Sequence, residues 1–163
     1  MNGTPDISLR LAGPPDAETI HEMIVALAQA TNSASKVSST ASDFSRFGFG
    51  DKAFFEALIA EADGRPIGLC LYFYTFSTWL GEPGIYVQDL YVNEDLRGAG
   101  VGRRLLQETA RRGRKRHASH LRLTVDHDNT SASHFYAHIG MHHRTEEDTY
   151  HIGGQAFLEW ANG

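Results

Sequence analysis

In the first third of the chain, the spacing of apolar residues changes from a strand pattern to a helix pattern. Apolar and polar residues alternate over Ser8–Leu11, which is typical of a strand with one buried face. Apolar residues then recur every three or four positions over Ala17–Ala30, which predicts an amphipathic helix with Asp16 as its N-cap. Residues 31–42 are rich in Ser, Thr and Ala and predict a loop, either a mobile connection or part of the substrate side. A short helix is expected within Asp43–Phe49.

The middle of the chain carries three strand-like runs in succession. Phe54–Glu61 and Pro66–Phe76 are separated by an Asp-Gly turn, which predicts a β-hairpin. Ile85–Val92 is the third apolar run. A helix-like run follows over Arg103–Arg114, and alternation returns over His120–Val125, which predicts another strand.

The last part of the chain predicts one more helix and two strands. The helix is expected over Thr130–Ile139, with Gly140 just beyond its C-terminal end. The strands are expected over Arg144–Ile152 and Gln155–Trp160. This order of elements predicts an α/β or α+β fold, with residues 1–163 forming one domain around a mixed sheet with flanking helices.

Composition narrows the classes of protein that fit. The chain has 163 residues, of which 41% are hydrophobic and 21% charged, as in ordinary globular proteins. The net charge of −5 argues against nucleic-acid binding, which requires a basic surface. Cys70 is the single cysteine, so no disulfide is expected, and its apolar surroundings predict a buried, unreactive thiol. Neither a signal peptide nor a membrane-spanning run is evident, so we expect a cytoplasmic protein.

A glycine-rich run separates the third strand from the helix after it. Its residues are Arg97, Gly98, Ala99, Gly100, Val101 and Gly102. A strand, a glycine turn and a helix in this order point free backbone N–H groups at an anion. Glycines also let the backbone approach the ligand closely. The run therefore predicts a pyrophosphate-binding loop.

Three classes of phosphate-binding loop differ in the residues they require. A Walker loop needs Gly-Lys followed by Ser or Thr, which the run lacks. A dinucleotide loop that starts at Gly98 needs a small residue where the chain has Arg103. The third class is Gln/Arg-x-x-Gly-x-Gly/Ala after a strand, and the run fits it at Arg97, Gly100 and Gly102.

This third pattern resembles the acetyl-coenzyme A loop of the GNAT superfamily of N-acetyltransferases. Leu90-Tyr91-Val92 precedes the loop, and Asn129 and Phe135-Tyr136 follow it in the order of the superfamily pattern. The resemblance covers nearly the whole chain. Within the superfamily the chain is most similar to the spermidine/spermine (diamine/thialysine) N-acetyltransferase branch, on the segments Tyr72–Phe76 and Tyr86–Val92.

The resemblance implies an acetyl-CoA-dependent enzyme with a splayed pair of strands that holds the coenzyme. The strand before the loop would bind the pantetheine arm through its backbone, and the loop would surround the pyrophosphate. The implied coenzyme-binding residues are Leu90, Tyr91, Val92, Arg97, Gly98, Ala99, Gly100, Val101, Gly102, Arg103, Asn129 and Tyr136.

Tyr136 matches the residue that protonates the leaving thiolate in this family. A phenol stays protonated at neutral pH and suits this role as a general acid. The other interpretation of Tyr136 is a core aromatic residue beside Phe135. The expected mechanism is direct attack of a neutral amine on the thioester, without a covalent enzyme intermediate.

Two positions depart from the polyamine-acetylating relatives and bear on the acceptor. Those relatives carry Glu-Asp where this chain has Gln88-Asp89, and Tyr-Glu where it has Ala30-Thr31. Gln88 and Asp89 are therefore expected to contact a small-molecule primary amine, but a polyamine acceptor is not expected. The alternatives are acetylation of a protein lysine or N-terminus, and a CoA-binding regulator without catalysis. The resemblance also implies a homodimer.

Two further clusters have simpler explanations. The basic run of residues 111–116 fits a solvated helix end, where cations complement the helix dipole, with a contact to the coenzyme's 3′-phosphate as a lesser alternative. His134 and His138 lie one helical turn apart, but no recognised carboxylate motif accompanies them, so no metal site is expected. His127 and Asp128 are expected in a solvated loop, with a proton relay as the alternative.

Overall fold

The computed structural model describes residues 5–163 and divides them into two compact units. The first unit extends to Asp126 and the second begins at His127. Each unit is described separately below. Of the helices in the described part of the chain, none has both the length and the apolarity needed to cross a membrane.

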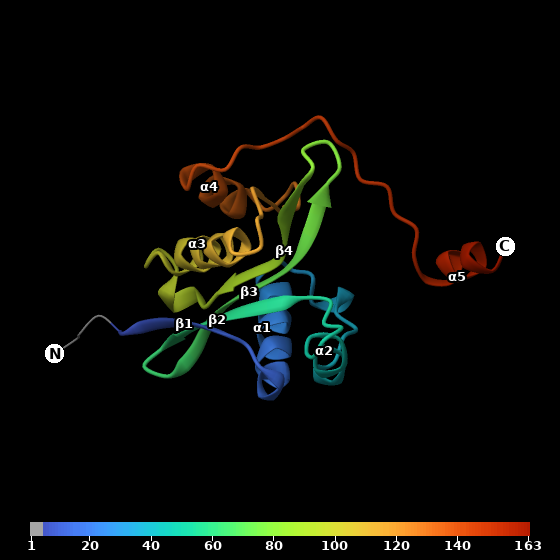
Figure 1. Ribbon diagram of the computed structural model, residues 1–163. Helices are drawn as coiled ribbons and strands as arrows, with labels where there is room; N and C mark the ends of the chain where they lie inside the picture. The colour runs from blue at the N-terminus through green and yellow to red at the C-terminus, as the bar shows by residue number, and fades with distance from the viewer. Residues whose placement is uncertain (1–4) are drawn as a thin grey trace. The chain divides into compact units, whose positions relative to one another are not determined.

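The first unit is built on one sheet of five strands in the order β1-β2-β3-β4-β5 (Figure 1). The first four strands pair antiparallel, and β4 pairs parallel with β5. The strands are β1 (Ile7–Leu11), β2 (Glu56–Ala62), β3 (Arg65–Ser77), β4 (Glu82–Val92) and β5 (His120–Arg122). The predicted mixed, mostly antiparallel sheet is therefore confirmed.

Helices cover both faces of this sheet (Figure 1). On one face, Ile20 and Met23 of α1 pack with Ile59 and Leu69 of the sheet in a buried cluster. On the other face, α3 contributes the fully buried Leu105 to the core. Alternating strand residues point to opposite faces, so the central strands β2 and β3 supply buried residues to both faces. The helices of this unit are α1 (Ala17–Ala30), α2 (Ala41–Phe47) and α3 (Val101–Arg114), with single 3-10 turns at Pro14–Asp16, Ala34–Lys36 and Glu94–Leu96.

Capping explains where α1 and α2 begin. Asp16 precedes α1 as expected, but its carboxylate bonds to the Gly13 N–H and to Arg10 instead of capping that helix. The second helix starts two residues earlier than predicted because Thr40 and Asp43 form a capping box, in which the Asp43 carboxylate accepts from the Thr40 N–H at 2.8 Å.

The second unit contains two helices, α4 (Thr130–His138) and α5 (Gly154–Asn162). The first agrees with the prediction to within one residue. The strand predicted over Gln155–Trp160 is wrong, because α5 covers it, and Arg144–Ile152 has no strand either. Short apolar runs are ambiguous between strand and helix, and here the good helix formers Gln, Ala, Leu and Glu favour the helix.

Candidate active site

A β-bulge interrupts the pairing of β3 with β4. Leu71 faces Asp89, but the next residue of β3, Tyr72, faces Val87. Gln88 is therefore the extra residue of the bulge, and its side chain is exposed. A bulge bends the strand and redirects side chains, and bulges are common beside active sites. The bulge thus lies at Gln88, the residue of the Gln88-Asp89 pair that departs from the polyamine-acetylating pattern.

On the edge of β4 opposite β3, the neighbouring strand β5 ends before the bulge. In the described part of the chain, β5 pairs with β4 only over Gly84–Tyr86. The His120 ring packs against Gly84, in the space that a Cβ would take. The rest of the strand, Val87–Val92, extends past the end of β5. The pairing of β4 with β5 therefore stops before the bulge among the described residues, and the splayed pair that holds the coenzyme stays a prediction from the resemblance.

The glycine-rich run forms an exposed loop that leads into the N-terminal end of α3. Gly98 and Gly100 have positive φ angles of 82° and 78°, a conformation that L-residues other than glycine adopt at a cost. Gly100 is the N-cap of α3, so the first N–H groups of the helix face outward without partners within the helix. Together with the helix dipole, these groups can bind an anion.

Three arginines lie around this loop and have different surroundings. Arg97 donates from Nε to the Val92 carbonyl at 3.3 Å, which links the loop to the end of β4. Arg104 reaches the Ile7 carbonyl at 2.7 Å and so ties α3 to β1. Arg103 is exposed and has no side-chain partner among the described residues. It is therefore the arginine best placed to add a charge-assisted contact to an anion in the loop.

Two ionisable side chains on β3 and β4 are held away from water. Asp89 is partly buried, and this burial raises the pKa of its carboxyl. Cys70 is fully buried, and burial raises the pKa of its thiol to about 12 although Thr109 donates a hydrogen bond to its sulfur at 3.3 Å. The buried, unreactive thiol predicted from the sequence is therefore confirmed, because nucleophilic cysteines need a lowered pKa.

Asn129 and Tyr136 both belong to the second unit. Asn129 is the N-cap of α4, and its Oδ1 accepts from the Ala132 N–H at 3.1 Å. Tyr136 lies two turns further along the same helix, and its ring contacts Phe135 edge-on at 5.1 Å. Residues seven positions apart on a helix lie on one face, so the two side chains can act on the same ligand.

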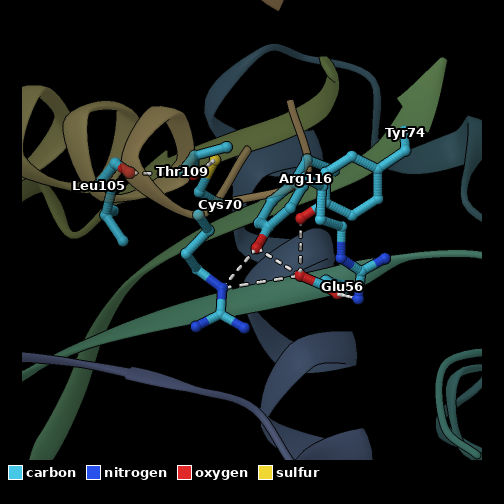
Figure 2. Close-up of polar contacts among 8 residues, drawn as sticks. Glu56, Cys70, Tyr74, Leu105, Thr109 and Arg116 are labelled. Carbon is cyan, nitrogen blue, oxygen red and sulfur yellow. Dashed lines mark hydrogen bonds and ion pairs between the residues drawn. The ribbon is translucent and has the colours of Figure 1, made fainter. Parts of the chain in front are cut away.

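A polar network that was not predicted from the sequence lies on the α3 face of the sheet (Figure 2). The Glu56 carboxylate accepts from the Tyr72 hydroxyl at 2.7 Å and from Arg116 at 2.9 Å. Arg112 donates to the Tyr72 hydroxyl at 3.0 Å, and Arg116 stacks over the Tyr74 ring. Arg112 and Arg116 thus fasten the C-terminal end of α3 to the sheet. Two arginines of the basic run therefore have a structural role. The β2–β3 hairpin, which pairs Glu56 with Tyr72, is the one part of this network that the sequence indicated.

The histidines do not gather into a ligand set. Within the described residues, no group of three or more His, Cys, Asp or Glu side chains is arranged to bind a metal ion.

Comparisons with known proteins agree with this geometry. Residues 22–141 match the acetyltransferase (GNAT) family. A thialysine N-epsilon-acetyltransferase of Sus scrofa is 32% identical over 166 residues, covering 95% of this chain and 97% of the relative. The Bos taurus protein of the same name is 31% identical with the same coverage.

Solved structures extend the likeness of the fold. An integron cassette protein from the mobile metagenome of V. cholerae has a TM-score of 0.82 at 19% identity, covering 99% of this chain and 100% of that one. An aminoglycoside N-acetyltransferase, AAC(6')-Iy, solved in complex with CoA, has a TM-score of 0.73 at 16% identity, covering 93% and 98%.

Proposed function

The chain belongs to the acetyltransferase (GNAT) family, and from this premise we propose that it acetylates the primary amine of a small, lysine-like molecule rather than a polyamine. It is an acetyl-CoA-dependent N-acetyltransferase. The observation that carries the choice of acceptor is the bulge in β4, where an exposed amide, Gln88, stands beside a single carboxylate, Asp89.

The acetyl donor binds along β4 and at the start of α3 in this proposal. Backbone groups of Leu90, Tyr91 and Val92 lie beyond the end of β5, where they can bond the pantetheine arm and polarise the thioester carbonyl. The pyrophosphate then meets the N–H groups of residues 98–103, with Arg103 as the nearby cation. Asn129 adds a contact to the coenzyme from the start of α4.

The transfer proceeds in one step on a neutral amine. The amine nitrogen attacks the thioester carbon, the C–N bond forms and the C–S bond breaks. Tyr136 donates its phenolic proton to the departing thiolate and regains a proton from solvent. No covalent enzyme intermediate is involved, since Cys70 is buried with a raised pKa.

The acceptor is inferred from charge. A polyamine carries two or more ammonium groups, and recognising them takes several carboxylates. The chain has an amide at position 88 and Ala30-Thr31 at the positions of the Tyr-Glu pair, so it lacks two of those anionic groups. A lysine analogue has two ammonium groups and one carboxylate, so its net charge of about +1 is lower than that of a polyamine and matches the smaller number of anionic groups. The name of the relatives at 31–32% identity supports the same class of acceptor.

Four features from the sequence remain predictions within this proposal. They are the single domain over residues 1–163, a homodimer, a cytoplasmic location and the absence of metal, nucleic-acid and membrane partners. Light scattering tests the homodimer directly, and a monomeric mass at micromolar concentration would refute it.

An amine panel with detection of free thiol tests the acceptor. We expect thialysine or another lysine analogue to give a higher kcat/KM than spermidine or spermine with the wild-type protein. The Gln88→Glu variant should narrow this gap because it returns a carboxylate to the bulge. A polyamine that matches the best substrate of the wild type would overturn the inference from Gln88.

A further inference from the structure

A pair of stacked aromatic rings lies beside the bulge of β4. The Phe73 ring of β3 and the Tyr86 ring of β4 stack with their centroids 5.2 Å apart and an interplanar angle of 26°. We propose that this pair is a specificity-determining wall of the acceptor site, against which the side-chain arm of a lysine-like acceptor packs. The inference rests on the proposed function, because it concerns the acceptor of the same transfer.

The bulge places the ring pair on the same face of the sheet as Asp89. By register, Leu71 of β3 faces Asp89, and two positions further along β3, Phe73 faces Tyr86. Leu71 belongs to the buried cluster under α1, and side chains two positions apart on a strand point to one face, so both pairs lie on the α1 face. Tyr86 and Asp89 are three positions apart, and a regular strand would point them to opposite faces. The extra residue, Gln88, therefore brings the rings and Asp89 onto one face.

The ring pair is not enclosed by the core of the first unit. Both rings are half-buried, whereas Leu71 and Tyr72, just before Phe73 on the same strand, are buried. In the described part of the chain β2 pairs with β3 only as far as Tyr72, and β3 and β4 continue beyond it as a hairpin (Figure 1). The rings therefore offer an accessible apolar surface, and aromatic side chains are typical of the walls of small-molecule sites.

A hydrogen bond holds the Tyr86 ring in place. Its hydroxyl lies 3.0 Å from the Oγ1 atom of Thr124, two residues after the end of β5. Tyr86 is also the last residue of β4 that pairs with β5 among the described residues. The two rings and Thr124 thus form a continuous wall across three segments of the chain, at the point where β4 and β5 stop pairing. A surface that is already fixed binds a ligand at a lower cost in conformational entropy.

The chemistry of this wall fits the arm of a lysine-like acceptor. Such an acceptor has methylene groups, or a thioether in thialysine, between its reacting amine and its α-carbon. Gln88 and Asp89 are polar and offer these apolar atoms little, whereas aromatic rings pack well against methylene groups and make a favourable contact with a thioether sulfur. Asp89 and Tyr86 lie at most about 10 Å apart along the strand, so one small acceptor can contact both.

Phe76 provides a matched control on the same strand. It is three positions from Phe73, so it points to the opposite face of the sheet, and it is 62% exposed. Phe73→Leu and Phe76→Leu therefore make the same chemical change on the two faces of β3, and only the first removes a ring of the wall. Phe73→Tyr keeps the ring and serves as the conservative variant.

The test compares thialysine with ethylamine, whose short chain does not reach the wall, by release of free thiol. For Phe73→Leu we expect the KM for thialysine to rise about tenfold with kcat within about threefold of wild type, because the wall contributes binding in the ground state and the transition state alike. The kcat/KM for ethylamine should stay within about threefold. Phe76→Leu should match the wild type with both amines, and Phe73→Tyr should retain the wild-type KM for thialysine.

The hydrogen bond to Thr124 gives a second test that leaves both rings in place. Tyr86→Phe and Thr124→Val each remove this bond, and each should raise the KM for thialysine about threefold. The double variant should show no larger rise than either single variant, because both changes remove one and the same interaction. Additive rises would contradict the role of this bond in fixing the wall.

Ethylamine separates a wall for the acceptor arm from a ring pair that only supports the fold. An equal loss of kcat/KM with thialysine and ethylamine in Phe73→Leu would show a general disturbance of the site and overturn the proposal. So would an unchanged KM for thialysine, or an equal rise in Phe76→Leu. Calorimetry of thialysine binding to the complex with CoA makes the same comparison without turnover. A wild-type protein that binds CoA but releases no thiol with any amine would instead refute the proposed function itself.

Discussion

Tyr72 donates a hydrogen bond of 2.7 Å from its hydroxyl to the Glu56 carboxylate, across the pair formed by β2 and β3. Tyr72 is fully buried and is the β3 residue at which the pairing with β4 shifts. The same hydroxyl accepts from Arg112 of α3 at 3.0 Å. One phenol therefore connects the bulge of the proposed site with the helix whose other end forms the anion-binding loop.

Removing that hydroxyl should cost stability. We expect Tyr72→Phe to lower the free energy of unfolding by about 1 kcal/mol, because it leaves two partly buried charged partners with one hydrogen bond fewer each. The matched control is Tyr74→Phe, whose hydroxyl lies 3.4 Å from the same carboxylate and is less buried, so its cost should be below about 0.5 kcal/mol. Urea unfolding measures both, and equal costs would contradict this account of the network.

Replacing Gly100 should weaken coenzyme binding in addition to lowering the stability of the fold. Gly100→Ala forces alanine into a φ near 78°, at a cost of about 1 kcal/mol, and strain in the loop moves N–H groups away from the pyrophosphate. We expect the Kd for CoA to rise by about tenfold or more, as measured by calorimetry.

A second glycine provides the control for this prediction. Gly64 in the β2–β3 turn has a φ of 77°, and an added Cβ meets no atom within 4 Å at either glycine. Gly64→Ala should therefore lower stability by the same amount and leave CoA affinity unchanged. If both variants lose affinity equally, the loss comes from destabilisation and the loop has no special role.

The phenol of Tyr136 should act on catalysis and not on binding. Tyr136→Phe should lower kcat by about 10²-fold, with the Kd for CoA unchanged, because only protonation of the thiolate is lost. Tyr150→Phe serves as the control, since this tyrosine of the second unit is 93% exposed. Rapid-quench measurement of a single turnover isolates the chemical step, and an unchanged rate would remove Tyr136 from the mechanism.

The ion pair at the start of α1 predicts a dependence of stability on pH. A hydrogen bond from Arg10 lowers the pKa of the Asp16 carboxyl, so Asp16 stabilises the fold above its unfolded-state pKa. This contribution disappears as pH falls through the lowered pKa. Asp16→Asn should cost about 1 kcal/mol near neutral pH, since Arg10 is 40% exposed and partly screened, and progressively less as pH falls through the lowered pKa. A cost independent of pH would show that the charge is not responsible.

The sequence predicted the parts of the fold that have a strong local signal. The observed helix Ala17–Ala30 has the predicted bounds, because its apolar stripe is long enough to define the helical period. The loop before α3 was predictable because its glycines adopt positive φ angles, which favour glycine. The C-terminal strands failed because Gln155–Trp160 is too short for its period to separate strand from helix.

Features that depend on contacts between residues far apart in the sequence could not be predicted from local sequence patterns. The bulge at Gln88 arises from the register between β3 and β4, which no single strand encodes. The Glu56 network joins residues that are 16 to 60 positions apart, so no local sequence pattern predicts these contacts. By contrast, Leu90–Val92 and the loop after them were found because strand, glycines and helix are contiguous.

The most direct test of the account follows the acetyl group to its product. Wild-type protein is incubated with acetyl-CoA labelled with carbon-13 at the acetyl carbonyl, in the presence of equal concentrations of thialysine and spermidine, and the products are separated and identified by NMR. The account predicts the label in an amide on the side-chain amine of thialysine, in excess over acetylated spermidine, with one free thiol per amide. Label found mainly on spermidine would contradict the proposed acceptor, and label found only in acetate would contradict amine acetylation itself.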